Sequence, residues 1–154
     1  MRGLFILALS LLSLNTFAAG SKIDIPKYDW SWKGFFGTYD RASAQRGLKV
    51  YREVCAGCHS MDLIAYRNLA DLGFSEAHIK AIAAEYLIPD GPNDEGEMFE
   101  REAIPSDRFA NPYPNVQAAR AANNGAYPPD LSLIVKARPK GADYLKALLL
   151  GYVE

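Results

Sequence analysis

The chain has few cysteines and histidines, the residues that stabilise a small fold through disulfide bonds or bound metal ions. Its 154 residues include two of each. These counts exclude a disulfide-dense fold. A domain of roughly 150 residues buries about two thirds of its unfolded surface and needs no such cross-links. With 49% hydrophobic and 23% charged residues, the chain is neither collagen-like nor disordered. The composition is that of one globular domain.

The chain also lacks an excess of positive charge and a long apolar run. Seventeen Lys and Arg stand against eighteen Asp and Glu, for a formal charge of -1. Proteins that bind nucleic acid usually carry a clustered basic excess, so we expect no nucleic-acid partner. No apolar run reaches the roughly 18 residues that a retained transmembrane helix requires. We therefore expect any permanent membrane anchor to lie outside this sequence.

The first residues are typical of a secretory signal peptide. Arg2 precedes an apolar stretch over residues 4–14, and small residues follow it. Cleavage after Ala18 places the small Thr16 three residues before the cut, which predicts a signal peptide over 1–18 and a mature domain over 19–154. A buried core helix is the alternative. In an oxidising compartment two thiols would be expected to form a disulfide, so both cysteines need an explanation.

The first half of the mature chain predicts two helices. Asp40 is a suitable N-cap for a helix whose apolar face recurs at steps of four, three and four and includes Cys55. Ser75 is a suitable N-cap for a second helix that ends before Pro89. We expect the aromatic-rich residues 22–40 to form an extended arm over the core.

The second half predicts shorter helices and one long loop. Residues 88–115 contain five prolines and no periodic stretch, which predicts an irregular loop. Asn115 and Asp130 are suitable N-caps for two short helices, and a last helix is expected over 142–150. No stretch has a convincing strand pattern. The predicted fold class is therefore mostly α.

The motif with clear chemistry is Cys55-Ala56-Gly57-Cys58-His59. C-x-x-C-H is typical of covalent attachment of a c-type haem. Two thiols one helical turn apart can add to the two vinyl groups of one porphyrin, and the adjacent imidazole then reaches the iron. Both cysteines would become thioethers, which accounts for the thiols of an exported protein. We expect a c-type cytochrome fold of short helices and long Pro/Gly-rich loops around one haem c.

Two other uses of the motif are disfavoured. A thioredoxin-like C-x-x-C needs a βαβ setting, and a structural zinc site needs another Cys or His pair. The sequence predicts no such setting, it has no third cysteine, and His78 is its only other imidazole.

A second axial ligand is expected if the iron shuttles electrons. Met61 follows His59 so closely that it lies on the same side of the ring. Met98 lies in an acidic segment, where a thioether more often packs, and His78 is more often a partly exposed helical residue. None of the three is a convincing ligand.

Several segments beyond the haem motif together resemble one family. The most specific is residues 118–132, with the sequence AARAANNGAYPPDLS. Others are residues 46–51, 58–62, 65–67, 90–93, 96–99 and 111–115. Over nearly all of the mature chain they resemble cytochrome c1, the haem-bearing subunit of the quinol–cytochrome c reductase (cytochrome bc1) complex.

The resemblance implies further haem contacts. It implies packing on the ring for Asn123, Pro128, Pro129 and Ile134. It implies that Arg138 pairs with a haem propionate, for which a guanidinium is well suited, and that Tyr144 hydrogen-bonds nearby.

Members of the cytochrome c1 family continue beyond the point that matches Glu154. That continuation holds an axial methionine and one C-terminal transmembrane helix, so we expect this sequence to be part of a longer chain. If it were complete, an open or weakly ligated iron with a lowered reduction potential would be expected.

An acidic segment predicts a docking surface. Arg101 is the only base between residues 90 and 107, against seven acids: Asp90, Asp94, Glu95, Glu97, Glu100, Glu102 and Asp107. Such asymmetry can steer a basic partner, although a solvated loop explains it equally well. The resemblance favours docking of a soluble cytochrome c.

The resemblance implies an electron-transfer subunit rather than an enzyme in its own right. It would take single electrons from a Rieske iron–sulfur protein and pass them to a soluble cytochrome c, beside cytochrome b. The expected location is the bacterial inner membrane, with the haem domain on the periplasmic side. Two alternatives remain: a haem enzyme or a gas or peroxide sensor with an open distal site, and a free soluble carrier. Whether the native chain continues past Glu154 distinguishes them.

Overall fold

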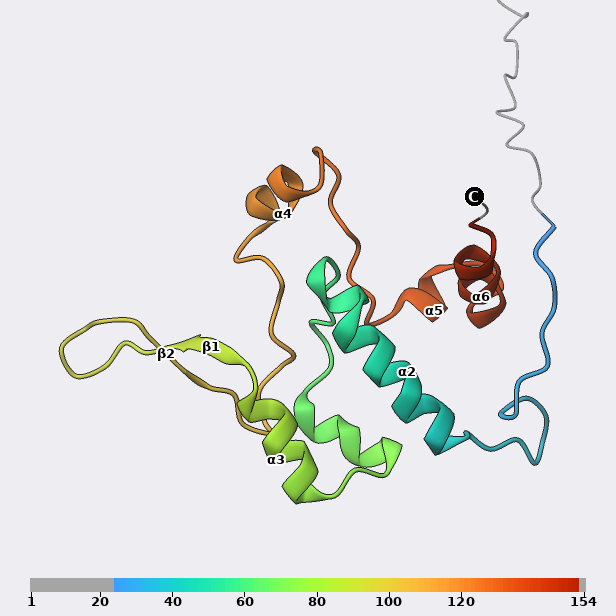
Figure 1. The fold of residues 1–154 in the computed structure, drawn as a ribbon, viewed down its shortest axis with the longest axis horizontal. Helices are drawn as coiled ribbons and strands as arrows, with labels where there is room; N and C mark the ends of the chain where they lie inside the picture. The colour runs from blue at the N-terminus through green and yellow to red at the C-terminus, as the bar shows by residue number, and fades with distance from the viewer. Residues whose placement is uncertain (1–23, 153–154) are drawn as a thin grey trace, which may run out of the picture.

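The computed structural model describes residues 24–152, so the predicted signal peptide lies outside the described residues. The helices and strands, in chain order, are α2 (Arg41–Glu53), η1 (Cys55–Gly57), η2 (Tyr66–Leu72), α3 (Glu76–Ala84), β1 (Leu87–Asp90), β2 (Phe99–Glu102), α4 (Val116–Ala122), α5 (Ile134–Ala137) and α6 (Ala142–Leu150). Helix α2 lies in the centre, the β hairpin projects on one side, and α5 and α6 lie on the other (Figure 1). Helices and loops predominate, which confirms the mostly α class.

Local capping sets where three of the helices begin, as predicted. The side chain of Asp40 accepts a hydrogen bond from the N–H of Ser43 at 3.0 Å, at the start of α2. Ser75 and Asn115 accept in the same way at the starts of α3 and α4. The bounds of α6 are also as predicted. Helix α2, however, ends before Cys55, which lies in η1 instead of on the α-helical face that the spacing predicted.

The core lies where α2, η2 and α3 meet. Its seven buried residues are Tyr51, Tyr66, Leu69, Ile79, Ala83, Ala103 and Phe109. The ring of Phe109 packs against Tyr66 and Tyr51, with centroids 4.8 and 6.0 Å apart. Aromatic pairs at these distances add to the burial of apolar surface. Within residues 24–152, no helix combines the length and the apolar character needed to cross a bilayer.

The prediction of one irregular loop over 88–115 is wrong where the β hairpin forms. Strands β1 and β2 pair antiparallel, from Leu87 opposite Glu102 to Asp90 opposite Phe99. Each strand has four residues, too few for a clear alternating pattern, and Pro89 argues against a strand. A two-stranded sheet has only edge strands, which tolerate proline. The hairpin therefore depends on pairing rather than on local propensity.

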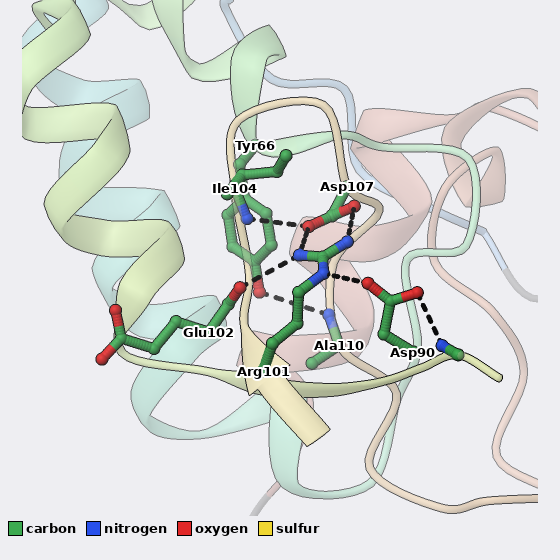
Figure 2. Close-up of polar contacts among 8 residues, drawn as sticks. Tyr66, Asp90, Arg101, Glu102, Ile104, Asp107 and Ala110 are labelled. Carbon is green, nitrogen blue, oxygen red and sulfur yellow. Dashed lines mark hydrogen bonds and ion pairs between the residues drawn. The ribbon is translucent and has the colours of Figure 1, made fainter. Parts of the chain in front are cut away.

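Two ion pairs made by one arginine stabilise the base of this hairpin. Arg101 on β2 makes a bidentate ion pair with Asp107, at 2.7 and 3.2 Å, and a second ion pair with Asp90 on β1 (Figure 2). Asp107 also accepts the N–H of Ile104 at 2.7 Å. These contacts raise the pKa of Arg101 and lower the pKa of both aspartates. Two of the seven predicted docking acids thus serve the hairpin itself.

The N-terminal arm packs on α6 and not on the core, which corrects the prediction for residues 22–40. Asp143 of α6 accepts the indole N–H of Trp30 at 2.6 Å and the backbone N–H of Tyr28 at 3.3 Å. The ammonium of Lys146 lies 4.2 Å from the ring centroid of Tyr28, as a cation–π contact. Chiefly through the indole hydrogen bond, these contacts lower the pKa of Asp143.

Replacing Arg101 by Gln should destabilise the protein measurably. Asp90 and Asp107 would keep their charges while losing the guanidinium that joins them. The melting temperature should fall by more than in the control Lys49→Gln, which breaks an exposed pair with Glu53 at 3.8 Å. Equal shifts for the two variants would contradict a special role of Arg101.

Acid should release the arm. Because the folded pKa of Asp143 lies below its unfolded value, its stabilisation is complete above about pH 4 and is lost as the pH falls through the folded pKa. Tryptophan fluorescence should therefore change on acidification of the wild-type protein. Asp143→Asn should lack this acid transition, and an identical transition in both proteins would rule out Asp143 as its cause.

Candidate functional site

The two cysteines and His59 lie in a tight turn after α2. The N–H groups of Cys58 and His59 both donate to the carbonyl of Cys55, at 3.1 and 2.8 Å. Both cysteines are free thiols; Cys55 is half-buried and Cys58 is exposed. The turn therefore presents two thiols next to a histidine in the chain.

The imidazole of His59 is held in one orientation. Its Nδ1 lies 2.8 Å from the carbonyl oxygen of Pro129. A carbonyl can only accept, so Nδ1 carries a proton, and in the neutral imidazole Nε2 is then the unprotonated nitrogen. A histidine whose Nδ1–H is fixed in this way is suited to bind a metal through Nε2.

Tyr51 holds the backbone of His59 from the side of α2. Its hydroxyl donates to the carbonyl of His59 at 3.2 Å. Burial, assisted by the nearby charge of Asp130, raises the pKa of Tyr51 to about 12. The hydroxyl therefore remains a donor at neutral pH.

The segment after His59 pairs with the segment after Pro128. The N–H of Leu131 donates to the carbonyl of Ser60 at 2.9 Å. The carboxylate of Asp130 accepts from the Ser60 hydroxyl at 2.9 Å and from the Asp62 N–H at 2.7 Å. Partial burial raises the pKa of Asp130, but hydrogen bonds from Asp62, Ser132 and Ser60 outweigh it and hold the pKa below its ordinary value.

The prediction that Asp130 caps a helix is wrong. The N-cap position of α5 is Leu133, and Asp130 accepts from residues on both sides of the site. The local sequence, an aspartate after two prolines and before a short helix, is the same for a helix N-cap and for an acceptor that joins two segments, so it does not distinguish these roles. Ser60 and Ser132, which complete this pairing, lie in segments that resemble the family, but the sequence did not indicate that they pair.

The chemistry of the motif and its neighbours fits a porphyrin. Val54, directly before Cys55, is 70% exposed. A cavity of about 200 Å³ borders Cys58, with Tyr127 and Pro128 in its lining. Two thiols, one imidazole with a free Nε2 and exposed apolar side chains are the groups that covalent haem attachment needs.

The structure brings only some of the predicted haem contacts to the motif. Pro129 contacts His59, and Pro128 shares the cavity with Cys58. Asn123 forms the C-cap of α4, where its amide donates to the carbonyl of Ala119 at 2.7 Å and to the hydroxyl of Tyr113 at 3.1 Å.

Three predicted contacts come from the last two helices. Ile134 begins α5 and is half-buried, and Arg138 is the exposed C-cap of that helix. Tyr144 is half-buried in α6 and lines an apolar cavity with Leu148. Among the described residues, no hydrogen bond or ion pair joins the side chain of Arg138 or Tyr144 to the motif.

The three candidates for a second axial ligand lie in different environments. Met61 packs against the core. Met98 is 66% exposed and directly precedes β2. The Nδ1 atom of His78 lies 3.0 Å from the hydroxyl of Ser75.

Five of the seven predicted docking acids are exposed and have no ion-pair partner among residues 24–152: Asp94, Glu95 and Glu97 between the strands, and Glu100 and Glu102 on β2. Asn93 orders the tip, since its side chain accepts the N–H groups of Glu95 and Glu97 at 3.1 and 2.8 Å. The exposed acids are thus presented on a structured element.

Comparison with known proteins identifies the family. The model of the Cytochrome C1 family matches residues 30–154. Cytochrome c1 of Rhodospirillum rubrum is 55% identical over 130 residues, which cover 84% of this chain and 48% of that protein. "Cytochrome c1 1, heme protein, mitochondrial" of Arabidopsis thaliana is 53% identical over 146 residues, 92% of this chain and 48% of that protein.

A fungal relative is named for its complex. "Cytochrome b-c1 complex catalytic subunit, mitochondrial" of Candida albicans is 53% identical over 135 residues, which cover 88% of this chain and 47% of that protein. The chain thus spans about half the length of these relatives. With the match over residues 30–154 and identities above one half, the chain belongs to the cytochrome c1 family.

Proposed function

We propose that this chain attaches one haem c covalently and serves as the electron-transfer subunit of a quinol–cytochrome c reductase complex. It takes single electrons from a Rieske iron–sulfur protein and passes them to a soluble cytochrome c. The observation that supports this most is the Cys55–His59 turn, in which the Nδ1 of His59 is fixed on the carbonyl of Pro129. Membership of the cytochrome c1 family supports the assignment to the complex.

Each residue of the motif has a separate role. Cys55 and Cys58 would hold the porphyrin through thioether bonds, and His59 would bind the iron through Nε2. When bound, the haem supplies a one-electron redox centre. The hydrogen bond from Tyr51 fixes the backbone carbonyl of His59, and the hydrogen bond from Nδ1 to Pro129 fixes its ring.

The remaining haem contacts are those that the resemblance to the cytochrome c1 family implies. Asn123, Pro128, Pro129 and Ile134 pack on the ring, Arg138 pairs with a propionate, and Tyr144 hydrogen-bonds nearby. The exposed position of Arg138 supports its role, because its guanidinium is accessible to a carboxylate. By resemblance to the family, a methionine would complete the coordination of the iron.

The acidic hairpin is the proposed docking surface for the soluble cytochrome c. Its five acids without ion pairs, Asp94, Glu95, Glu97, Glu100 and Glu102, produce a negative field that steers a basic partner to this face. Asp90 and Asp107, which belong to the predicted surface, act indirectly through Arg101 by holding the hairpin in shape.

The proposed location is the bacterial inner membrane, with this domain on the periplasmic side beside cytochrome b and the Rieske protein. Residues 1–18 support export as a signal peptide. An exported location also suits the two thiols, which thioether formation protects from disulfide exchange.

A haem-stained denaturing gel of membranes from the source cell tests attachment. The wild-type band, identified by peptides from residues 118–132, should stain, and the variant with both cysteines changed to Ala should lose the stain completely. A wild-type band without haem would contradict the proposal. A soluble stained band at or below 17 kDa would instead favour a free carrier or a sensor.

The axial role of His59 has a matched control on α3. His59→Ala should abolish the low-spin haem spectrum, while His78→Ala should preserve it, because His78 contacts Ser75 and not the motif. Equal loss in both variants would contradict the specific assignment.

Charge reversal tests the docking surface. The double variant Glu95→Lys/Glu97→Lys should slow association with a basic soluble cytochrome c by about tenfold at low ionic strength, and the effect should shrink with added salt. Stopped-flow electron transfer measures it. The control Asp71→Lys/Glu76→Lys makes the same charge change near η2 and α3, and should have a smaller effect. Equal slowing by both would remove the hairpin from the docking site.

A further inference from the structure

We propose that Asp130 is the positioning residue of His59: its carboxylate accepts hydrogen bonds from the segment after His59 and from the segment after Pro129, and thereby fixes the imidazole on the Pro129 carbonyl. We call these hydrogen bonds of Asp130 the clasp. This inference rests on the proposed haem function, which makes the orientation of that ring chemically important. It assigns to Asp130 a task beyond local turn formation.

The two carboxylate oxygens of Asp130 divide their partners between the two segments. One oxygen, Oδ2, accepts the hydroxyl of Ser60 at 2.9 Å and the N–H of Asp62 at 2.7 Å. The other, Oδ1, accepts the N–H of Ser132 at 2.9 Å. A neutral side chain with a single acceptor oxygen cannot replace both sets. Ser60 is buried at 8% exposure, so its hydroxyl needs this partner inside the protein.

The clasp lies next to the hydrogen bond that orients His59. Ser60 follows His59 directly and Asp130 follows Pro129 directly, so the clasp acts one residue from each end of the 2.8 Å contact between Nδ1 and the carbonyl. Two further bonds continue the pairing outward. Leu131 donates to the carbonyl of Ser60 at 2.9 Å, and Leu63 donates to the hydroxyl of Ser132 at 3.0 Å.

The charge of Asp130 acts at the same place. Its hydrogen bonds keep its pKa low, so it is an anion at neutral pH, and its field contributes to the raised pKa of Tyr51. Tyr51 in turn donates to the carbonyl of His59. A histidine with a firmly held N–H donates more electron density to a bound iron, and a nearby anion favours the ferric state. Both effects lower the reduction potential.

The test is the reduction potential of the haem in the full-length protein in its native membranes. Asp130→Asn should raise the potential and alter the spectroscopic signature of histidine ligation. The matched control is Asp62→Asn, which removes a carboxylate of the same charge close by but keeps the backbone N–H that donates to Asp130. The control should shift the potential less and leave the histidine signature unchanged.

Equal effects of Asp130→Asn and Asp62→Asn would overturn the proposal, because charge alone would then explain the shift. If Asp130→Asn fails to accumulate, Ser60→Ala serves in its place, since it removes one hydrogen bond of the clasp and no charge. Ser60→Ala should raise the potential by a smaller amount, and no shift would overturn the proposal. A wild-type protein without haem would refute the proposed function itself, which is a different result from an unshifted variant.

Discussion

The hydrogen bond between His59 Nδ1 and the carbonyl of Pro129 is the interaction on which the site depends. It joins residues 70 positions apart, so it forms only when the turn after α2 and the double-proline segment before α5 are brought together. The proline carbonyl decides the tautomer of the imidazole, and the tautomer decides which nitrogen can bind iron. Much of the surrounding structure holds the two ends of this one contact in place.

Two side chains hold it from different directions. Tyr51, part of the core, fixes the backbone of His59, and Asp130 fixes the residues that follow both partners. Tyr51 of α2 thus links the core to the site, because its ring packs on Phe109 and its hydroxyl donates to the carbonyl of His59. The acidic hairpin lies elsewhere and projects to one side of α2, on the side opposite α5 and α6 (Figure 1). The proposed haem site and the proposed docking surface therefore use separate elements, so substitutions at one should not disturb the other.

Local signals predicted the parts of the fold that local interactions determine. Asp40, Ser75 and Asn115 bond to N–H groups three residues away, so the sequence alone located the starts of α2, α3 and α4. The C-x-x-C-H spacing likewise identified the motif. The hairpin and the role of Asp130 were missed because they depend on partners distant in sequence: Arg101 meets Asp90 across two strands, and Asp130 meets Ser60. The arm was misplaced for the same reason, since a pattern of aromatic residues does not reveal that Asp143 of α6 is the acceptor for Trp30.

The central claim is that this turn carries a covalently bound haem, and mass spectrometry of the native protein tests it most directly. After proteolysis, the peptide that contains Cys55 and Cys58 should have the mass of its sequence plus one haem, with neither cysteine open to alkylation. The same peptide with two alkylated cysteines, or with a disulfide between them, would contradict the account.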